Sequence, residues 1–147
     1  MEFGVQLFTV SKYLRDDAEK LFRNLSEMGY TIIEPCISLP PEEQKVNRAA
    51  KKGAGPFLGI EEVDNVMKIA GEYGLHANSC HINGSIMSNV KFLESLKEKY
   101  NITQFIIGMA RDMSEENIES YVEKYKDMSN AVKSFDGEIL IHNGSRE

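Results

Sequence analysis

The sequence predicts an α/β fold built on a parallel sheet. Short runs rich in β-branched and aromatic residues alternate along the chain with longer segments whose apolar residues recur at helical spacing. This alternation is typical of parallel strands that are joined by crossover helices. The chain has 147 residues, of which 41% are hydrophobic and 27% charged, as expected for one folded domain. We therefore treat residues 1–147 as a single domain.

Five strands are expected, and each consists of a short apolar run. They are predicted at residues 4–9, 31–37, 76–82, 103–109 and 138–143. The segment 38–59 departs from the regular alternation and is interpreted as an insertion after the second strand. Long loops of this kind in compact domains are commonly functional or mobile.

Four amphipathic helices are expected between these strands. Asp16 and Glu19 form a plausible capping pair for the first helix, and the fourth helix is expected to begin after Ser114. Their inward stripes are predicted to be Ala18, Leu21, Phe22, Leu25 and Met28; Val63, Val66, Met67 and Ala70; Val90, Leu93 and Leu96; and Ile118, Tyr121, Val122, Tyr125, Met128 and Val132. The helices are expected to end near Gly29, Gly74, Asn101 and Gly137.

Net charge, hydropathy and cysteine content argue against several classes of function. The formal net charge of −6 argues against nucleic-acid binding, which usually requires a basic face. No apolar run approaches the ~20 residues that span a bilayer, and the N-terminus lacks the pattern of an export signal. Cys36 and Cys80 lie in apolar runs and are expected to be buried, reduced thiols. We therefore expect a cytoplasmic protein that binds neither nucleic acid nor membrane.

The strand–helix pattern alone leaves two architectures open. An open doubly wound sheet and part of a (β/α)8 barrel both use parallel strands in this order. A complete barrel needs about 250 residues, more than this chain has. The residues at the strand ends are needed to choose between these architectures.

Four strand ends carry short motifs, namely GVQLFTV at 4–10, GYTIIEP at 29–35, SCHI at 79–82 and IHNGSRE at 141–147. In their order and spacing these motifs resemble the sugar phosphate isomerase/epimerase family of xylose isomerase-like TIM barrels. The resemblance covers essentially the whole chain. It implies an incomplete TIM barrel of about five strands and four helices, equivalent to the N-terminal half of the family's domain.

The fifth strand matches the family's pattern only in part. Many members have Tyr-His-Asn-His-x-x-Glu here, and His142, Asn143 and Glu147 match that pattern. Ile141 stands in place of the Tyr, and Gly144 in place of the second His. The second imidazole of the family's pattern is therefore missing from this strand.

A parallel barrel gathers its functional residues at the carboxyl ends of its strands. Glu34 lies in an apolar run, so its carboxylate needs a partner or a shifted pKa. It is either a site residue or a structural hydrogen-bonding group, and His81 is either a site residue or a satisfied core histidine. By resemblance, the catalytic candidates are Glu34, His81 and Glu147. The substrate-binding candidates are Gln6, Thr9, Arg111, His142 and Asn143, with a surface ion pair as the alternative for Arg111.

The resemblance implies that the intact protein is a sugar or polyol isomerase or epimerase. The family's divalent metal (Mn, Mg, Co or Zn) is held mainly by residues from the fifth strand onward, so this chain by itself need not bind one. Two other hypotheses stay open: a non-catalytic half-barrel that self-associates, and a doubly wound module that binds a small molecule. We expect a sugar or polyol as ligand and a homo-oligomeric state, because exposed sheet edges favour association.

Overall fold

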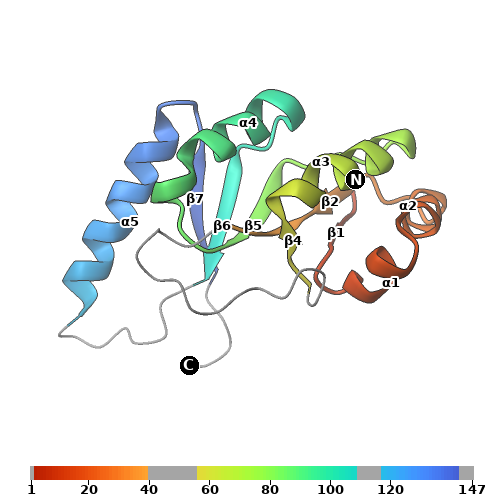
Figure 1. Cartoon of the computed structure of the whole chain (residues 1–147), viewed down its shortest axis with the longest axis horizontal. Helices are drawn as coiled ribbons and strands as arrows, with labels where there is room; N and C mark the ends of the chain where they lie inside the picture. The colour runs from red at the N-terminus through yellow and green to blue at the C-terminus, as the bar shows by residue number, and fades with distance from the viewer. Residues whose placement is uncertain (1, 40–55, 109–116, 143–147) are drawn as a thin grey trace.

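The computed structural model describes residues 2–39, 56–108 and 117–142. Strands and helices alternate along the chain, as Figure 1 shows. The elements are β1 (Gly4–Gln6), α1 (Ser11–Asp16), α2 (Ala18–Glu27), β2 (Ile32–Glu34), β3 (Cys36–Ser38), β4 (Leu58–Gly59), α3 (Ile60–Glu72), β5 (Ser79–Asn83), the 3-10 turn η1 (Met87–Asn89), α4 (Val90–Tyr100), β6 (Gln104–Gly108), α5 (Ile118–Lys133) and β7 (Glu138–His142).

The strands pair in parallel and, apart from β4 at the edge of the second sheet, in the order of the chain. β1 pairs with β2, and the second sheet has the order β4-β3-β5-β6-β7. β2 and β3 are the two halves of the predicted second strand, separated by Pro35, which has no backbone N–H to donate. A doubly wound sheet would place the first strand between the second and third. That alternative is therefore wrong, and the incomplete barrel is confirmed.

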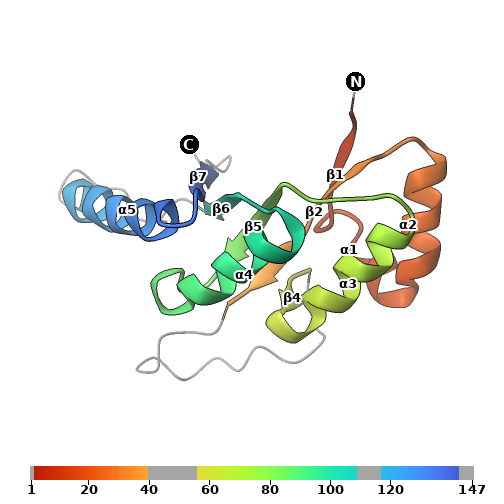
Figure 2. The ribbon, with the colours of Figure 1, turned by 90° about the horizontal axis from the view of Figure 1, so that it is seen from above.

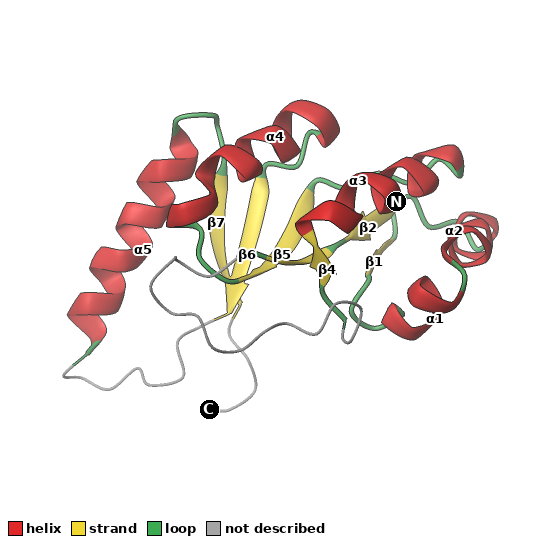
Figure 3. Ribbon diagram, viewed as in Figure 1, coloured by secondary structure: helices red, strands yellow, loops and turns green. Residues whose placement is uncertain are grey.

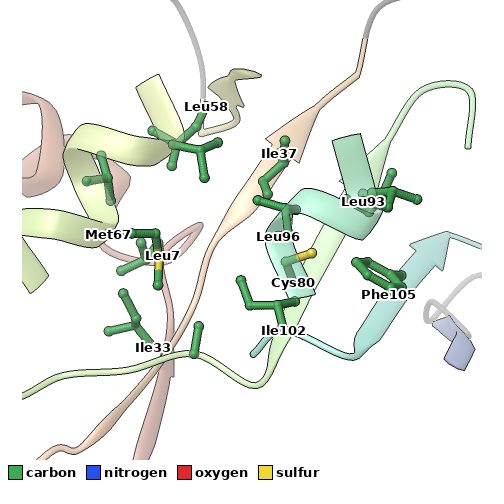
Figure 4. Packing of buried hydrophobic residues seen from close by; sticks show 14 of the residues in the cluster. Leu7, Ile33, Ile37, Leu58, Met67, Cys80, Leu93, Leu96, Ile102 and Phe105 are labelled. Atoms are coloured by element: carbon green, nitrogen blue, oxygen red, sulfur yellow. The ribbon is translucent and has the colours of Figure 1, made fainter. Parts of the chain in front are cut away.

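The helices cover one side of the strands. Figure 2 shows α2, α3, α4 and α5 arranged along the outside of the row of strands, and Figure 3 shows the same layers by type of element. The core lies between these helices and the sheet, and includes Phe22, Ile33 and Phe105, all fully buried. Figure 4 shows part of this packing around Cys80. We call the opposite side of the sheet, away from the helices, the inner face.

Three of the predicted helix C-termini agree with the structure, and the predicted N-cap of the first helix differs by one residue. The residues with positive φ after α2, α3 and α4 are Gly29, Gly74 and Asn101, as predicted. The N-cap of α2 is Asp17, not Asp16, because the Asp17 carboxylate accepts a hydrogen bond from the Lys20 N–H at 2.9 Å. Asp16 instead ends α1, a short helix that the sequence pattern did not predict.

The fourth predicted helix corresponds to α5 and is less buried than expected. Met128 and Val132 are buried, but Ile118 is 44% and Val122 42% exposed, so the prediction that both point inward is wrong. At the other end, the residue with positive φ is Asp136 rather than Gly137. The predicted start of this helix after Ser114 lies outside the described residues.

Two further predictions concern the second strand and the thiols. The insertion 38–59 includes a short strand, β4, that pairs with β3, while residues 40–55 lie outside the described part. Cys36 and Cys80 are both free and buried, as predicted. In the described ranges no helix has the length and apolar character needed to cross a bilayer.

Candidate functional site

Five side chains from β1, β2, β5 and β7 gather on the inner face. The Gln6 amide donates to Glu34 Oε1 at 2.6 Å, and the Ser79 hydroxyl donates to Glu34 Oε2 at 3.1 Å. His81 Nδ1 lies 3.5 Å from Gln6 Nε2 and 3.9 Å from Glu34 Oε1. The ring of His142 meets that of His81 edge to face, with centroids 5.1 Å apart. We call these five residues the inner-face cluster.

Backbone hydrogen bonds on both sides of the second strand fix the cluster. The Leu7 N–H donates to the carbonyl of Glu34 at 2.9 Å, and the His81 N–H donates to the carbonyl of Pro35 at 2.8 Å. Two consecutive carbonyls therefore bind neighbouring strands on opposite sides. The ladders that contain these bonds pair Gln6 with Glu34 and align β3 with β5. Residues far apart in sequence thus converge at one level of the sheet.

Glu34 is at the centre of the cluster. Each of its two carboxylate oxygens accepts one hydrogen bond, from Gln6 and from Ser79, so its orientation is fixed. The side chain keeps 21% of its surface exposed. A carboxylate has further lone pairs beyond two hydrogen bonds. Glu34 is therefore held rigidly but can still accept a hydrogen bond or a proton from a ligand.

His81 is mainly uncharged near neutral pH. Burial lowers its pKa from the ordinary value of 6.5, the neighbouring Glu34 carboxylate raises it, and His142 lowers it further. Desolvation is the largest of these effects because only 13% of the side chain is exposed. A neutral imidazole has one donor and one acceptor nitrogen. His81 can therefore bind hydroxyl or carbonyl oxygens without bringing a positive charge.

The structure brings together four of the eight residues predicted for the site. Gln6, Glu34, His81 and His142 are in contact through the cluster. Thr9 makes a different interaction, because its hydroxyl donates to the carbonyl of Gln6 at 2.8 Å, at the end of β1. The remaining three candidates, Arg111, Asn143 and Glu147, lie outside the described residues.

Ser79 is the cluster residue that the sequence prediction missed. It is the buried polar residue found in the described part of the chain, with 9% of its surface exposed. It precedes His81 by two residues on β5, so both side chains point to the same face. That spacing was the available signal.

The two buried thiols are not nucleophiles in this structure. Burial raises the pKa of Cys36 to about 11, with a smaller contribution from Glu34 and a partly opposing hydrogen bond to the Phe8 backbone. Burial also raises the pKa of Cys80, strongly. Since the thiolate is the reactive species, both groups remain protonated and unreactive near neutral pH. Burial thus disfavours the thiolate of both cysteines.

The described residues do not fit a metal ion. No group of three or more His, Cys, Asp or Glu side chains in residues 2–39, 56–108 and 117–142 is arranged to hold one. Both oxygens of Glu34 already accept hydrogen bonds, and Gln6 Nε2 lies against His81 Nδ1. A metal site at this end of the sheet would need ligands from beyond these residues.

Comparison with known proteins supports the fold. No protein-family model and no curated protein matches the sequence. Among solved structures, the chain is similar to a sugar phosphate isomerase/epimerase from Parabacteroides distasonis, with a TM-score of 0.70 and 16% identity over 98% of this chain. It is also similar to a xylose isomerase-like TIM barrel protein from Mycobacterium smegmatis in complex with magnesium, with a TM-score of 0.59 and 13% identity over 95% of this chain.

These similarities show the fold, which is part of a TIM barrel like the barrels of these two structures. The resemblance that the strand-end motifs indicated is confirmed at that level. The chain spans about half the length of these structures, 51% of the first and 54% of the second. An incomplete barrel is consistent with both values. Identities of 16% and 13% are too low for activity to be carried over from the fold alone.

Proposed function

We propose that this chain supplies half of the substrate pocket of a sugar or polyol isomerase or epimerase. The observation that carries the proposal is the carboxylate of Glu34 beside the imidazole of His81, at the carboxyl ends of parallel strands. Parallel barrels place their active sites at this end. The similarity to a structure described as a sugar phosphate isomerase/epimerase supports the same assignment.

The chemistry of the cluster suits a polyhydroxylated ligand. A sugar presents hydroxyl groups that both donate and accept hydrogen bonds, and a carbonyl that only accepts. Glu34 can accept from a hydroxyl or take a proton from the carbon next to the carbonyl, and His81 can bind a ligand oxygen. We assign Glu34, His81 and Glu147 to catalysis, and Gln6, Thr9, Arg111, His142 and Asn143 to substrate binding.

We further propose that the intact barrel is cytoplasmic and requires a divalent metal, namely Mn, Mg, Co or Zn. A bound divalent ion would stabilise the negative charge that develops on the substrate oxygens. Its ligands would come from outside the described residues, since the cluster itself does not fit a metal. The magnesium in the Mycobacterium smegmatis structure supports this proposal.

The test uses proton exchange as a direct readout of proton abstraction. The chain is incubated in D2O with a panel of ketoses and with Mn²⁺ or Mg²⁺, and NMR follows deuterium entering at the carbon next to the carbonyl. If the chain is active, Glu34→Gln should lower the exchange rate by ~10² or more, the usual size of a general acid–base contribution. Exchange at the same rate in Glu34→Gln and in the unaltered chain would refute the assignment.

Sugar binding provides a second measurement and a matched control. Glu34→Gln and His81→Gln should weaken binding of a ketose in an NMR titration. Gln104→Met should not, because the Gln104 amide donates to Glu138 at 3.3 Å and not to Glu34 or His81. Equal weakening by all three variants would mean that the effect does not come from the cluster. Activity equal to that of a whole barrel would show that the second half of the pocket is unnecessary.

A second candidate is a non-catalytic half-barrel that self-associates. Within the described residues β1 pairs only with β2, and β7 only with β6, so each has an unpaired edge. Phe3, next to β1, is 55% exposed, and Ile141 on β7 is 45% exposed. Unpaired edges with apolar neighbours favour association between copies. A single-chain mass by light scattering at high dilution, with cooperative unfolding retained, would argue against this candidate.

A further inference from the structure

The amide of Gln6 is placed between the two reactive groups of the cluster. Its Nε2 atom lies 2.6 Å from Glu34 Oε1 and 3.5 Å from His81 Nδ1. One amide nitrogen therefore faces both a carboxylate oxygen and a ring nitrogen. The nitrogen of a side-chain amide donates two hydrogen bonds and accepts none. Both of its neighbours must therefore be hydrogen-bond acceptors.

The carboxylate determines which end of the amide faces the cluster. An ionised carboxylate only accepts hydrogen bonds, so at 2.6 Å it must face the NH2 group and not the amide oxygen. The second hydrogen of that NH2 is then available to His81 Nδ1. This nitrogen can accept it only when it carries no proton, since an N–H there would face another donor.

We propose that Gln6 is a positioning residue that holds His81 in the tautomer with its proton on Nε2. Glu34 cannot select the other tautomer directly, because its nearest oxygen is 3.9 Å from Nδ1, beyond hydrogen-bonding distance. Instead, the two hydrogens of the Gln6 NH2 group face Glu34 Oε1 and His81 Nδ1. His81 then presents Nε2–H as a donor.

The charged and titratable neighbours of His81 are consistent with this arrangement. Glu34 favours a positive imidazole, whereas burial and His142 oppose it. Cys36, the register partner of His81 on β3, is an uncharged thiol. No described neighbour other than Glu34 therefore draws a second proton onto the ring.

The tautomer of His81 determines which residue of the proposed active site donates a hydrogen bond and which accepts a proton. With Nδ1 bound by Gln6 and Nε2 protonated, the neutral His81 has no free nitrogen to act as a base. It acts as a hydrogen-bond donor to a carbonyl or hydroxyl oxygen of the sugar. Glu34 is then the described residue that accepts the proton. This division of roles rests on the proposed function, whereas the tautomer itself does not.

The tautomer is measured in the ligand-free chain by long-range ¹H–¹⁵N NMR of the histidine rings. The chain has three histidines, and the variants His76→Gln and His142→Gln assign their signals. In the unaltered chain, His81 should show a protonated Nε2 and an unprotonated, hydrogen-bonded Nδ1. A Nδ1–H tautomer would overturn the proposal, whether or not the chain binds sugars.

Two Gln6 variants test whether Gln6 sets the tautomer of His81. Gln6→Glu replaces the donor by an acceptor, so His81 should shift toward the Nδ1–H form and its pKa should rise by about one unit or more. Gln6→Met removes the donor, and the excess of the Nε2–H form should fall by about tenfold, the usual worth of one hydrogen bond. Gln104→Met, which removes the inner-face amide that donates to Glu138, should leave His81 unchanged. Identical His81 spectra in Gln6→Glu and the unaltered chain would refute the role of Gln6.

Failure of the proposed function gives a different result. If the chain neither binds nor isomerises sugars while Gln6→Glu still shifts the His81 tautomer, the positioning role stands and the sugar assignment falls. If Glu34→Gln abolishes sugar binding while the His81 tautomer does not respond to Gln6, the reverse holds.

Discussion

Replacing Gly84 by alanine should destabilise the fold more than any other small substitution at a described glycine. Gly84 follows β5 and has a φ of 123°, a conformation essentially restricted to glycine. A Cβ placed there would lie 2.5 Å from the carbonyl oxygen of Leu39 and 3.0 Å from its Cβ. The Leu39 N–H donates to the carbonyl of Asn83 at 2.7 Å, so neither backbone can move without losing that bond.

The expected destabilisation has two sources, the positive φ of Gly84 and the crowding of the new Cβ against Leu39. The unfavourable φ costs ~1–3 kcal/mol, and crowding against a fixed backbone costs another ~1–3 kcal/mol. We therefore expect Gly84→Ala to lower the free energy of unfolding by about 3–4 kcal/mol. For a chain of this length, where each kcal/mol shifts the melting temperature by ~2–4 °C, Tm should fall by roughly 10 °C.

Thermal and urea unfolding, followed by circular dichroism, measure this change. Gly71→Ala is the matched control, because Gly71 lies in α3 and a Cβ there would have no heavy atom within 4 Å. That variant should be stabilised by ~0.5–1 kcal/mol, since alanine favours the helix. An unchanged Tm in Gly84→Ala would show that the close approach of β3 and β5 does not exist in solution.

Three further predictions concern the site and its surroundings. Ser79→Ala removes a buried donor to Glu34 and should cost ~1–1.5 kcal/mol in urea unfolding, and an unchanged midpoint would mean that the hydroxyl contributes nothing. Because the pKa of folded His81 lies below 6.5, the unfolded chain binds more protons in the window between them. The stability that comes from neutral His81 is therefore complete above pH 6.5 and is lost as the pH falls through the folded pKa. His81→Gln should flatten this part of the plot of unfolding free energy against pH. A slope that persists in His81→Gln would contradict this prediction. Cys36 and Cys80 should not react with a thiol reagent at pH 8 in the folded chain and should react fully in urea, whereas rapid labelling of the native protein would show that they are not buried.

The alternation of elements could be predicted from the sequence because it depends on local pattern. The strand predicted at 103–109 is observed as β6, Gln104–Gly108, and the apolar stripe of the second helix is buried in α3 at all four positions. Such patterns report which residues share a face. They do not report whether another element covers that face. This is why Ile118 and Val122 in α5 have the right spacing but remain exposed.

Local hydrogen bonds set the details that pattern cannot determine. Asp16 and Asp17 are equally good capping residues by type, and the structure selects Asp17 because α1 continues through Asp16. Pro35 lies inside a predicted strand, and its missing N–H divides that strand between two neighbours. Each outcome depends on a neighbouring segment, so neither could be read from a single window of sequence.

In the candidate site, too, the sequence indicates the residue types, whereas the contacts between them depend on the fold. The rule that functional residues lie at the carboxyl ends of parallel strands selects Glu34 and His81 from the sequence. Their contact depends on the register of β2 and β3 against β5, which the backbone bond from His81 to Pro35 fixes. A slip of one residue would turn His81 toward the core and away from Glu34.

The bridging position of Gln6 depends on a further register, that between β1 and β2, so it could be identified only from the structure. Gln6 is separated from Glu34 by 28 residues and from His81 by 75, and two independent strand pairings must be correct for one amide to reach both. This dependence explains why residue type alone suggested a substrate contact for Gln6. Among the described residues its NH2 group already has two protein partners, Glu34 and His81, which leaves the amide oxygen for a ligand. The part of Gln6 that can act on a sugar is therefore an acceptor, while the donor at this point of the pocket is His81.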